Sequence, residues 1–292
     1  MQAQRGSSPS CVTRLANLVA FSHSVFALPF ALMMIGIVAR TVAVSWYQVV
    51  LLVVCVVSAR TAAMGWNRIV DGEIDRVNPR TVGREIPAGI VSRFEAWLLV
   101  ALASVLFLLG SALLGIHCFA CAPFVLLLLF SYSFFKRFSA LCHGILGIAL
   151  ACAPGGVWYA LTGTFSWLPV PLMSGVVFWV AGFDIIYSLQ DAEFDRQHGL
   201  FSIPAKIGEV KARVLAVALH VLAVACLVLN GMVFGLGSVY YLGAFLFALS
   251  VALQHGEVAR YGIGVVSRAF FVRNGIASIA LCVASFIDLW IH

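Results

Sequence analysis

Residues 49–77 read VVLLVVCVVSARTAAMGWNRIVDGEIDRV, an apolar run followed by evenly spaced polar residues. The apolar part is long enough to cross a bilayer as a helix, which takes about 20 residues. Asn67, Asp71 and Asp75 then follow at intervals of four, and at roughly 100° per residue they lie on one helical face. The stretch therefore predicts a membrane-spanning helix whose end presents a row of oxygen ligands.

The composition extends this expectation to the whole chain. Of the 292 residues, 62% are hydrophobic and 10% are charged, and the mean hydropathy is +1.04, which excludes a water-soluble fold. We predict an all-α membrane protein with a cytosolic tail over residues 1–19 and a single transmembrane domain over 20–292, because the loops leave no room for a second soluble domain. The predicted spans cover about residues 20–39, 42–66, 94–115, 118–135, 140–162, 170–190, 212–232, 237–254 and 269–291.

The basic residues are distributed unevenly across the predicted membrane. All 18 Lys and Arg residues except Arg40 fall on the side of the N-terminus and the even-numbered connections, and this grouping places Arg60 with the second connection. A basic excess of this kind marks the cytoplasmic side. It therefore favours a multi-pass membrane protein that contacts lipid and not nucleic acid. We expect a bacterial plasma membrane, with the site facing the cytoplasm, and an organelle membrane is the alternative. Nothing in the sequence indicates an obligatory protein partner.

The acidic residues are concentrated at two corresponding points on this side. Eight of the 12 lie within 71–85 and 184–195, at the ends of the second and sixth predicted spans. Asp184, Asp191 and Asp195 are spaced i, i+7, i+11 and share a helical face. Because hard cations such as Mg²⁺ prefer carboxylate oxygens and bridge to phosphate, two facing rows predict a site for about two or three Mg²⁺ ions around a diphosphate. The alternative is that these carboxylates are solvated or pair with nearby arginines.

Basic residues accompany the acidic rows. Arg80 and Arg84 follow the first row, and Lys136 and Arg137 end the fourth predicted span on the same side. Such side chains would neutralise the oxyanion of a departing diphosphate, although topology also explains each of them. A transporter with intramembrane carboxylates is a competing interpretation. Transporters place such acids near the bilayer midplane, whereas these lie at one face, so the pattern favours an enzyme.

With these motifs in place, the chain closely resembles the UbiA superfamily of intramembrane prenyltransferases over essentially everything past residue 20. Four elements carry the resemblance, and together they are specific. They are N-x-x-x-D-x-x-x-D at Asn67, Asp71 and Asp75; R-T-x-x-R-x-x-P-x-G at Arg80, Thr81, Arg84, Pro87 and Gly89; Y-x-x-x-K-R at Tyr132, Lys136 and Arg137; and a second aspartate motif at Asp184, Asp191 and Asp195.

The resemblance implies a UbiA fold of about nine helices and a Mg²⁺-dependent reaction. A polyprenyl group would pass from an isoprenyl diphosphate to an aromatic hydroxy acid, of the 4-hydroxybenzoate type, in ubiquinone or menaquinone biosynthesis. The metal would be held by Asn67, Asp71, Asp75, Asp191 and Asp195. Catalysis would rest on Asp71, Asp75, Asp191, Asp195 and Arg137, and the substrates would contact Asn67, Arg80, Arg84, Tyr132, Lys136 and Asp184.

Three departures from the family pattern leave the acceptor open. Ala20–Ser24 stands where many 4-hydroxybenzoate enzymes have R-x-x-K-P, and Phe201 stands where G-x-K-S has lysine. His23 with Phe26–Phe30 resembles a branch of futalosine-pathway menaquinone synthesis, which would make the acceptor 1,4-dihydroxy-6-naphthoate. A sibling transferase making haem O, chlorophyll or archaeal lipid ethers is a further alternative. The histidines form no metal-spaced cluster, and the cysteines, including C-x-x-C at 118–121, are expected to pack as small hydrophobes.

Overall fold

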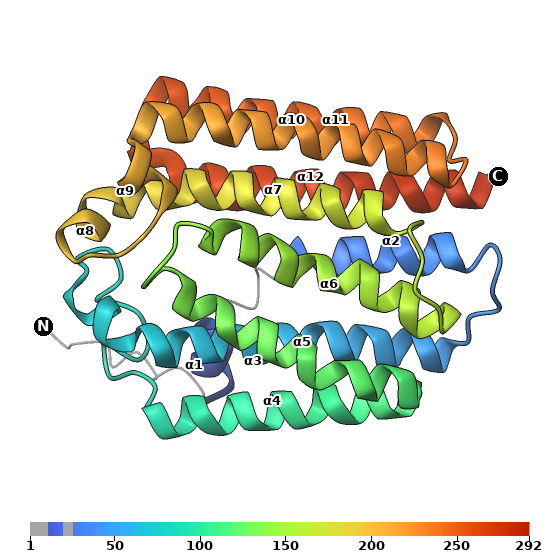
Figure 1. Ribbon diagram of the computed structural model, residues 1–292, viewed down its shortest axis with the longest axis horizontal. Helices are drawn as coiled ribbons and strands as arrows, with labels where there is room; N and C mark the ends of the chain where they lie inside the picture. Colours follow the sequence, from blue (N-terminus) through green and yellow to red (C-terminus); the bar gives the residue numbers. More distant parts are fainter. Residues whose placement is uncertain (1–10, 20–25, 292) are drawn as a thin grey trace, which may run out of the picture.

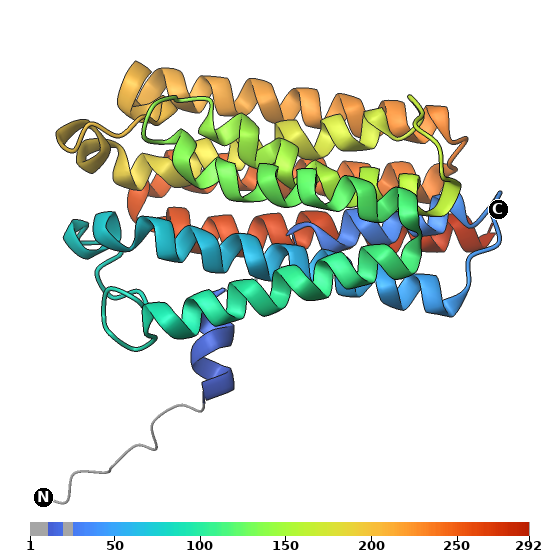
Figure 2. The same ribbon diagram turned by 60° about the horizontal axis from the view of Figure 1, so that its bottom comes forward.

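The computed structural model describes residues 11–19 and 26–291 of the chain. Over these residues the regular secondary structure is entirely helical, and the long helices run side by side in one bundle (Figures 1 and 2). The helices are α1 (Cys11–Leu18), α2 (Leu28–Val38), α3 (Trp46–Val77), α4 (Arg93–Leu114), α5 (Ile116–Phe135), α6 (Cys142–Thr162), α7 (Val170–Ser188), α8 (Ala192–Gln197), α9 (Ile203–Ile207), α10 (Glu209–Val233), α11 (Ser238–Tyr261) and α12 (Val266–Ile291).

Eight helices of the described chain are long and apolar enough to cross a membrane, and they match the second to ninth predicted spans. At the first predicted span, 20–39, the structure describes α2, an apolar helix of 11 residues. Residues 20–25, which include His23 and the Ala20–Ser24 departure, lie outside the described residues. The all-α membrane architecture is therefore confirmed.

Helix α3 is longer than its predicted span. It begins in a capping box formed by Ser45 and Gln48 and runs for 32 residues to Val77. At 1.5 Å per residue it is about 48 Å long, whereas the hydrocarbon core of a bilayer is about 30 Å thick. The polar end of the segment quoted above therefore belongs to the helix itself, so the helical frame fixes the spacing of its side chains.

The two ends of the bundle differ in character. The connection 78–92, α8 and α9 gather at one end, on the left in Figure 1, and we call this the motif end. The C-terminus and the connection between α2 and α3 lie at the opposite end. At that opposite end Arg40 donates to the carbonyl of Phe234 at 2.9 Å. The loops with the acidic and basic motifs are thus brought to one end of the molecule.

Small residues and aromatic rings set the packing of the central helices. Trp179 of α7 is fully buried among the rings of Phe30, Phe183 and Phe247, and its Nε1 donates to Asn274 Oδ1 at 2.8 Å. Where α6 crosses α7, a Cβ on Gly147 would lie 2.5 Å from the carbonyl oxygen of Val177. A glycine is therefore required for the two helices to approach this closely.

Replacing Gly147 with Ala is expected to destabilise the α6–α7 contact. The added methyl group meets backbone, which cannot rotate away, and overpacking of this kind costs about 1–3 kcal/mol. Gly144→Ala is the matched control, because a Cβ at Gly144 meets nothing within 4 Å. Thermal unfolding in detergent should show a lower midpoint for Gly147→Ala only. Equal midpoints for the two variants would contradict this account of the helix crossing.

Candidate active site

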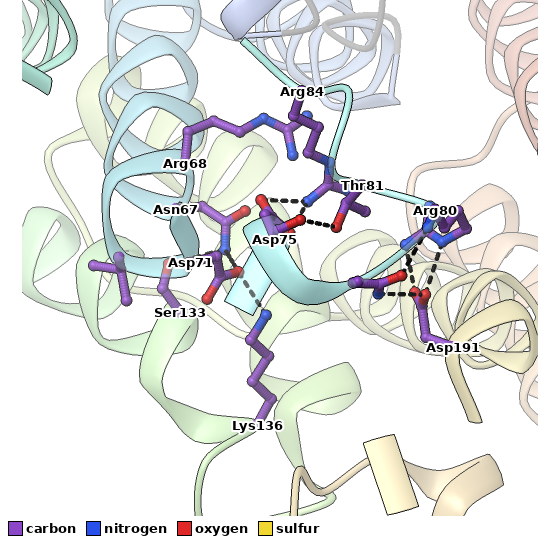
Figure 3. Close-up of polar contacts among 12 residues, drawn as sticks. Asn67, Arg68, Asp71, Asp75, Arg80, Thr81, Arg84, Ser133, Lys136 and Asp191 are labelled. Carbon is purple, nitrogen blue, oxygen red and sulfur yellow. Dashed lines mark hydrogen bonds and ion pairs between the residues drawn. The ribbon is translucent and has the colours of Figure 1, made fainter. Parts of the chain in front are cut away.

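The first row of oxygen ligands lies on the last turns of α3. Asp71 and Asp75 are each only 3% exposed, although both are at the end of a helix that extends beyond the span. Asn67 Nδ2 donates to Asp71 Oδ2 at 3.0 Å. Figure 3 shows Asn67, Asp71 and Asp75 following one another along the helix. A buried carboxylate without compensation is costly, so the partners of these groups decide what the site can do.

Asp71 is compensated from the end of α5. Lys136 Nζ lies 2.6 Å from Asp71 Oδ2, and Arg137 Nη2 lies 3.5 Å from Asp71 Oδ1. Arg137 makes its shorter hydrogen bonds, both 2.9 Å, to the carbonyl oxygens of Ser133 and Val70. Lys136 is thus the close ionic partner of Asp71, while Arg137 mainly ties α5 to α3.

Asp75 is compensated by the connection 78–92, which folds back over the end of α3. Arg84 Nη1 lies 2.8 and 2.9 Å from the two oxygens of Asp75. Thr81 Oγ1 donates to the carbonyl oxygen of Asp75 at 3.3 Å. Thr81 and Arg84, six and nine positions after Asp75, therefore fold back onto the first aspartate row (Figure 3).

The same connection reaches the second aspartate motif through Arg80. Arg80 Nε donates to Asp191 Oδ1 at 2.8 Å and its Nη2 also contacts this carboxylate. Asn78 Nδ2 donates to Asp191 Oδ1 at 3.0 Å, and Arg80 Nη1 donates to the Tyr187 hydroxyl at 2.9 Å. Burial disfavours the guanidinium cation, but its bonds to Asp191 and Tyr187 outweigh this and raise the pKa of Arg80. Arg80 thus joins the two halves of the site while remaining charged.

The second motif is carried by two helices with a short turn between them, and not by one uninterrupted α-helix. Helix α7 ends at Ser188, and a 3₁₀ turn over Leu189–Asp191 separates it from α8. A 3₁₀ turn winds more tightly than an α-helix, by about 20° per residue, so the turn rotates Asp191 and Asp195 relative to Asp184 by about 60° more than a continuous helix would. Asp184 lies 2.6 Å from His143, and Asp195 accepts from Ser202 Oγ at 2.7 Å.

The donor set fits Mg²⁺ shared with a phosphate ligand. Over the described residues no three His, Cys, Asp or Glu side chains converge as a metal cage. Mg²⁺ rarely uses such a cage, however, and takes one or two carboxylates together with substrate phosphates and water. The carboxylates of Asp71, Asp75, Asp191 and Asp195 and the amide oxygen of Asn67 are ligands of the right hardness. Three of these carboxylates, those of Asp71, Asp75 and Asp191, also pair with Lys or Arg, as the alternative interpretation of the acidic rows expects.

An apolar chamber of about 160 Å³ lies deeper in the bundle, between α3, α4, α5 and α6. Leu52, Phe107, Leu129 and Leu150 are among its lining residues. Tyr132 also lines it, one helical turn before Lys136. The chamber therefore begins about one turn below the ion pair between Lys136 and Asp71.

The grouping of Arg60 with the second connection is wrong, because this residue lies within α3 and lines the chamber. Its Nε is buried and has no hydrogen-bond partner within the described part of the chain. An arginine at membrane depth is costly and is by default a functional candidate. A signal was present in the sequence: Arg60 precedes Asn67 by seven residues, about two turns, and so belongs to the same helical face.

Other residues named from the sequence fall into place at the motif end. Phe201, which stands where lysine was expected, is 43% exposed, and its backbone N–H donates to the carbonyl oxygen of Lys136 at 2.7 Å. His198 stacks on Phe194 with ring centroids 3.9 Å apart. His143, which the sequence motifs do not single out, contacts Asp184 of the second motif.

The sequence and the fold were compared with those of known proteins. A profile described as the UbiA prenyltransferase family matches residues 27–276. The chain belongs to this family. An apo UbiA homologue from Aeropyrum pernix K1 has a TM-score of 0.82 and 34% identity, with 91% of this chain and 98% of that chain covered. A UbiA homologue from Archaeoglobus fulgidus bound to GPP and Mg²⁺ shares the fold, at a TM-score of 0.64 and 17% identity.

Two relatives of this UbiA family member are both named 4-hydroxybenzoate octaprenyltransferase. A 4-hydroxybenzoate octaprenyltransferase from Pseudomonas fluorescens is 31% identical over 207 residues, which are 68% of this chain and 67% of the relative. One from Vibrio campbellii is 27% identical over 249 residues, 84% of this chain and 86% of the relative. The similarity thus extends through both aspartate motifs and along most of the bundle.

Proposed function

We propose that this UbiA family member transfers a polyprenyl group from its diphosphate to an aromatic hydroxy acid of the 4-hydroxybenzoate type. The observation that carries the proposal is an acidic and basic site at the motif end, joined by Arg80 and Asp191, directly beyond an apolar chamber. A diphosphate with a long apolar chain has the same two parts. That relatives are 4-hydroxybenzoate octaprenyltransferases supports the choice of substrates.

In this proposal the polar site takes the diphosphate. Mg²⁺, when bound, supplies Lewis acidity and neutralises phosphate charge. Arg80, Arg84 and Lys136 are cations held within the site by carboxylates, so they are in place to exchange those partners for phosphate oxygens. The C–O bond of the prenyl diphosphate breaks, the acceptor ring forms the new C–C bond, and the ring then loses a proton. The residues proposed as metal ligands are Asn67, Asp71, Asp75, Asp191 and Asp195.

The acceptor carboxylate is assigned to Arg60. Its guanidinium is the charged group on the lining of the chamber, which otherwise consists of apolar side chains, thiols and the hydroxyl groups of Ser111, Tyr132 and Tyr159. A carboxylate in the chamber would be an anionic partner for this guanidinium. This assignment favours an aromatic acid over an uncharged acceptor.

Arg60→Met is expected to raise the KM for the aromatic acid by about 10–100-fold, because a charged hydrogen bond contributes roughly 1.5–3 kcal/mol. The KM for the prenyl diphosphate should change little, and Arg60→Lys should keep part of the affinity. Steady-state kinetics in detergent with each substrate varied in turn would measure this. Arg213→Met is the control, because Arg213 forms its ion pair with Glu209 on α10. An unchanged KM for the acid in Arg60→Met would contradict the assignment.

We also propose that residues 20–292 act as one transmembrane unit whose motif end faces the cytoplasm of a bacterial plasma membrane. The support is the charge distribution: among the described residues Arg40 lies at the opposite end, Arg60 lies within the bundle, and the remaining basic residues lie toward the motif end. The C-terminus lies opposite the motif end (Figure 1). A C-terminal alkaline phosphatase fusion should therefore be active and a C-terminal GFP fusion dark. The reverse result would overturn this orientation.

The direct test of the function supplies purified protein with Mg²⁺ and octaprenyl diphosphate. Three acceptors are offered in parallel: 4-hydroxybenzoate, 1,4-dihydroxy-6-naphthoate and 1,4-dihydroxy-2-naphthoate. We expect the prenylated 4-hydroxybenzoate as the main product by mass spectrometry. A main product from 1,4-dihydroxy-6-naphthoate would assign the protein to the futalosine branch instead. Absence of any prenylated aromatic acid would overturn the proposal.

A further inference from the structure

His143 contacts the second aspartate motif from a different part of the chain. It is the second residue of α6 and is only 2% exposed. Its Nδ1 lies 2.6 Å from Asp184 Oδ2. Its Nε2 accepts a hydrogen bond from the backbone N–H of Ile203, with 3.2 Å between the nitrogens. The imidazole therefore lies between a motif carboxylate and the start of α9.

These two contacts determine the tautomer of His143. A backbone N–H can only donate, so Nε2 must present its lone pair to Ile203 and carries no proton. In the neutral imidazole the proton is then on Nδ1, from which it is donated to Asp184. A doubly protonated ring would direct an N–H against the N–H of Ile203. The two contacts thus hold the imidazole of His143 in one orientation, with Nδ1 toward Asp184 and Nε2 toward Ile203.

The segment before α9, Phe201 and Ser202, is hydrogen-bonded to residues of both the α5–α6 connection region and the second aspartate motif. The carbonyl oxygen of Phe201 accepts from Cys142 Sγ at 3.5 Å, and the Phe201 N–H donates to Lys136. The next residue, Ser202, donates to Asp195 Oδ2 at 2.7 Å, and Ile203 follows. Two consecutive residues therefore contact the second motif, Ser202 directly and Ile203 through His143.

Packing alone does not account for an imidazole at this position. The side chain of His143 is 3% exposed, whereas that of Asp184 is 26% exposed. Oδ2 of Asp184 is thus engaged on the buried side while the carboxylate as a whole remains accessible. A carboxylate with one oxygen fixed cannot turn freely about its terminal bond, which preserves one orientation for a ligand.

We propose that His143 is a positioning residue of the second aspartate motif. It holds the carboxylate of Asp184 in one orientation and couples it to the segment that also holds Asp195. This inference rests on the proposed function, in which Asp184 contacts a substrate. His143 itself does not touch the reacting groups, and its effect on turnover passes through Asp184.

Two amide substitutions separate the contacts of His143. Asn places its amide near the level of Nδ1 and can still donate to Asp184, whereas Gln places its amide near the level of Nε2 and can still accept from Ile203. We expect His143→Asn to retain turnover within several-fold of wild type. His143→Gln and His143→Ala should lose about 10–100-fold in kcat, as is typical when a residue that orients a ligand is removed. His117→Asn, at the opposite end of the bundle, is the control.

A double-mutant cycle with Asp184→Asn distinguishes positioning from folding. If His143 acts through Asp184, adding His143→Ala to Asp184→Asn should reduce the remaining turnover by less than about 2-fold. An equal fold-loss in both backgrounds, or wild-type turnover in His143→Gln, would overturn the inference. Wild-type turnover is measured in the same series. Its absence would overturn the proposed function, whereas wild-type turnover with an additive cycle would overturn only the role of His143.

Discussion

Asp71→Asn is expected to reduce prenyl transfer by at least about 100-fold, the effect of removing one major electrostatic contact of a reacting site. The substitution keeps the shape of the side chain and its place beside Asn67 and Lys136. In the proposed function it removes one of the few negative charges that would bind Mg²⁺. It also leaves Lys136 without its close anionic partner.

The matched control for Asp71→Asn is Glu73→Gln. Glu73 lies on the same helix, between the two aspartates of the row, but its side chain is 65% exposed and pairs with Arg76 and Arg93 on the outer face. Initial rates in detergent, after equal expression and membrane insertion have been verified, should fall only for Asp71→Asn. Wild-type rates in that variant would remove the first aspartate row from the mechanism.

A substitution in the second aspartate motif can be compared with a matched control in the same way. Asp191→Asn should lower the rate by a similar factor, because it removes the carboxylate that Arg80 uses to join the two motifs. Glu193→Gln is its control, since Glu193 pairs with Arg196 at an exposed position. A large effect of Glu193→Gln with none of Asp191→Asn would show that the Arg80 bridge has no functional importance.

Removal of divalent metal is expected to abolish turnover, and added Mg²⁺ should restore it. Without a divalent cation, a diphosphate would face the carboxylates of Asp71, Asp75 and Asp191, and this repulsion opposes binding. Turnover in EDTA should be at background and should return when Mg²⁺ exceeds the chelator. Chelator that is saturated with Mg²⁺ beforehand is the control. Unchanged turnover in EDTA would rule out the metal–diphosphate arrangement.

A binding measurement extends this prediction beyond turnover. Prenyl diphosphate should raise the thermal midpoint of the protein only when Mg²⁺ is present, because a ligand stabilises the state to which it binds. Stabilisation by the diphosphate in chelator would indicate that Arg80, Arg84 and Lys136 suffice for binding. In that case the metal would act on the reaction and not on substrate affinity.

The sequence by itself determined the class of fold and much of the site's composition. Hydropathy defines membrane helices because apolar length is a local property of the chain. The first row, from Asn67 to Asp75, could be placed on one face because a continuous helix carries it. Arg60 lies two turns before Asn67 on the same helical face. The spacing alone could therefore have predicted that Arg60 belongs to the site.

The tertiary structure decided which of these residues meet. The turn after Ser188 interrupts the helix that carries the second motif. The bonds from Arg80 to Asp191 and from His143 to Asp184 cannot be predicted from residue spacing. Each of those pairs joins helices or loops that lie far apart in the sequence, so it exists only once the helices have packed. Helical periodicity is a property of neighbouring residues, whereas contact across a bundle depends on the relative position of whole helices.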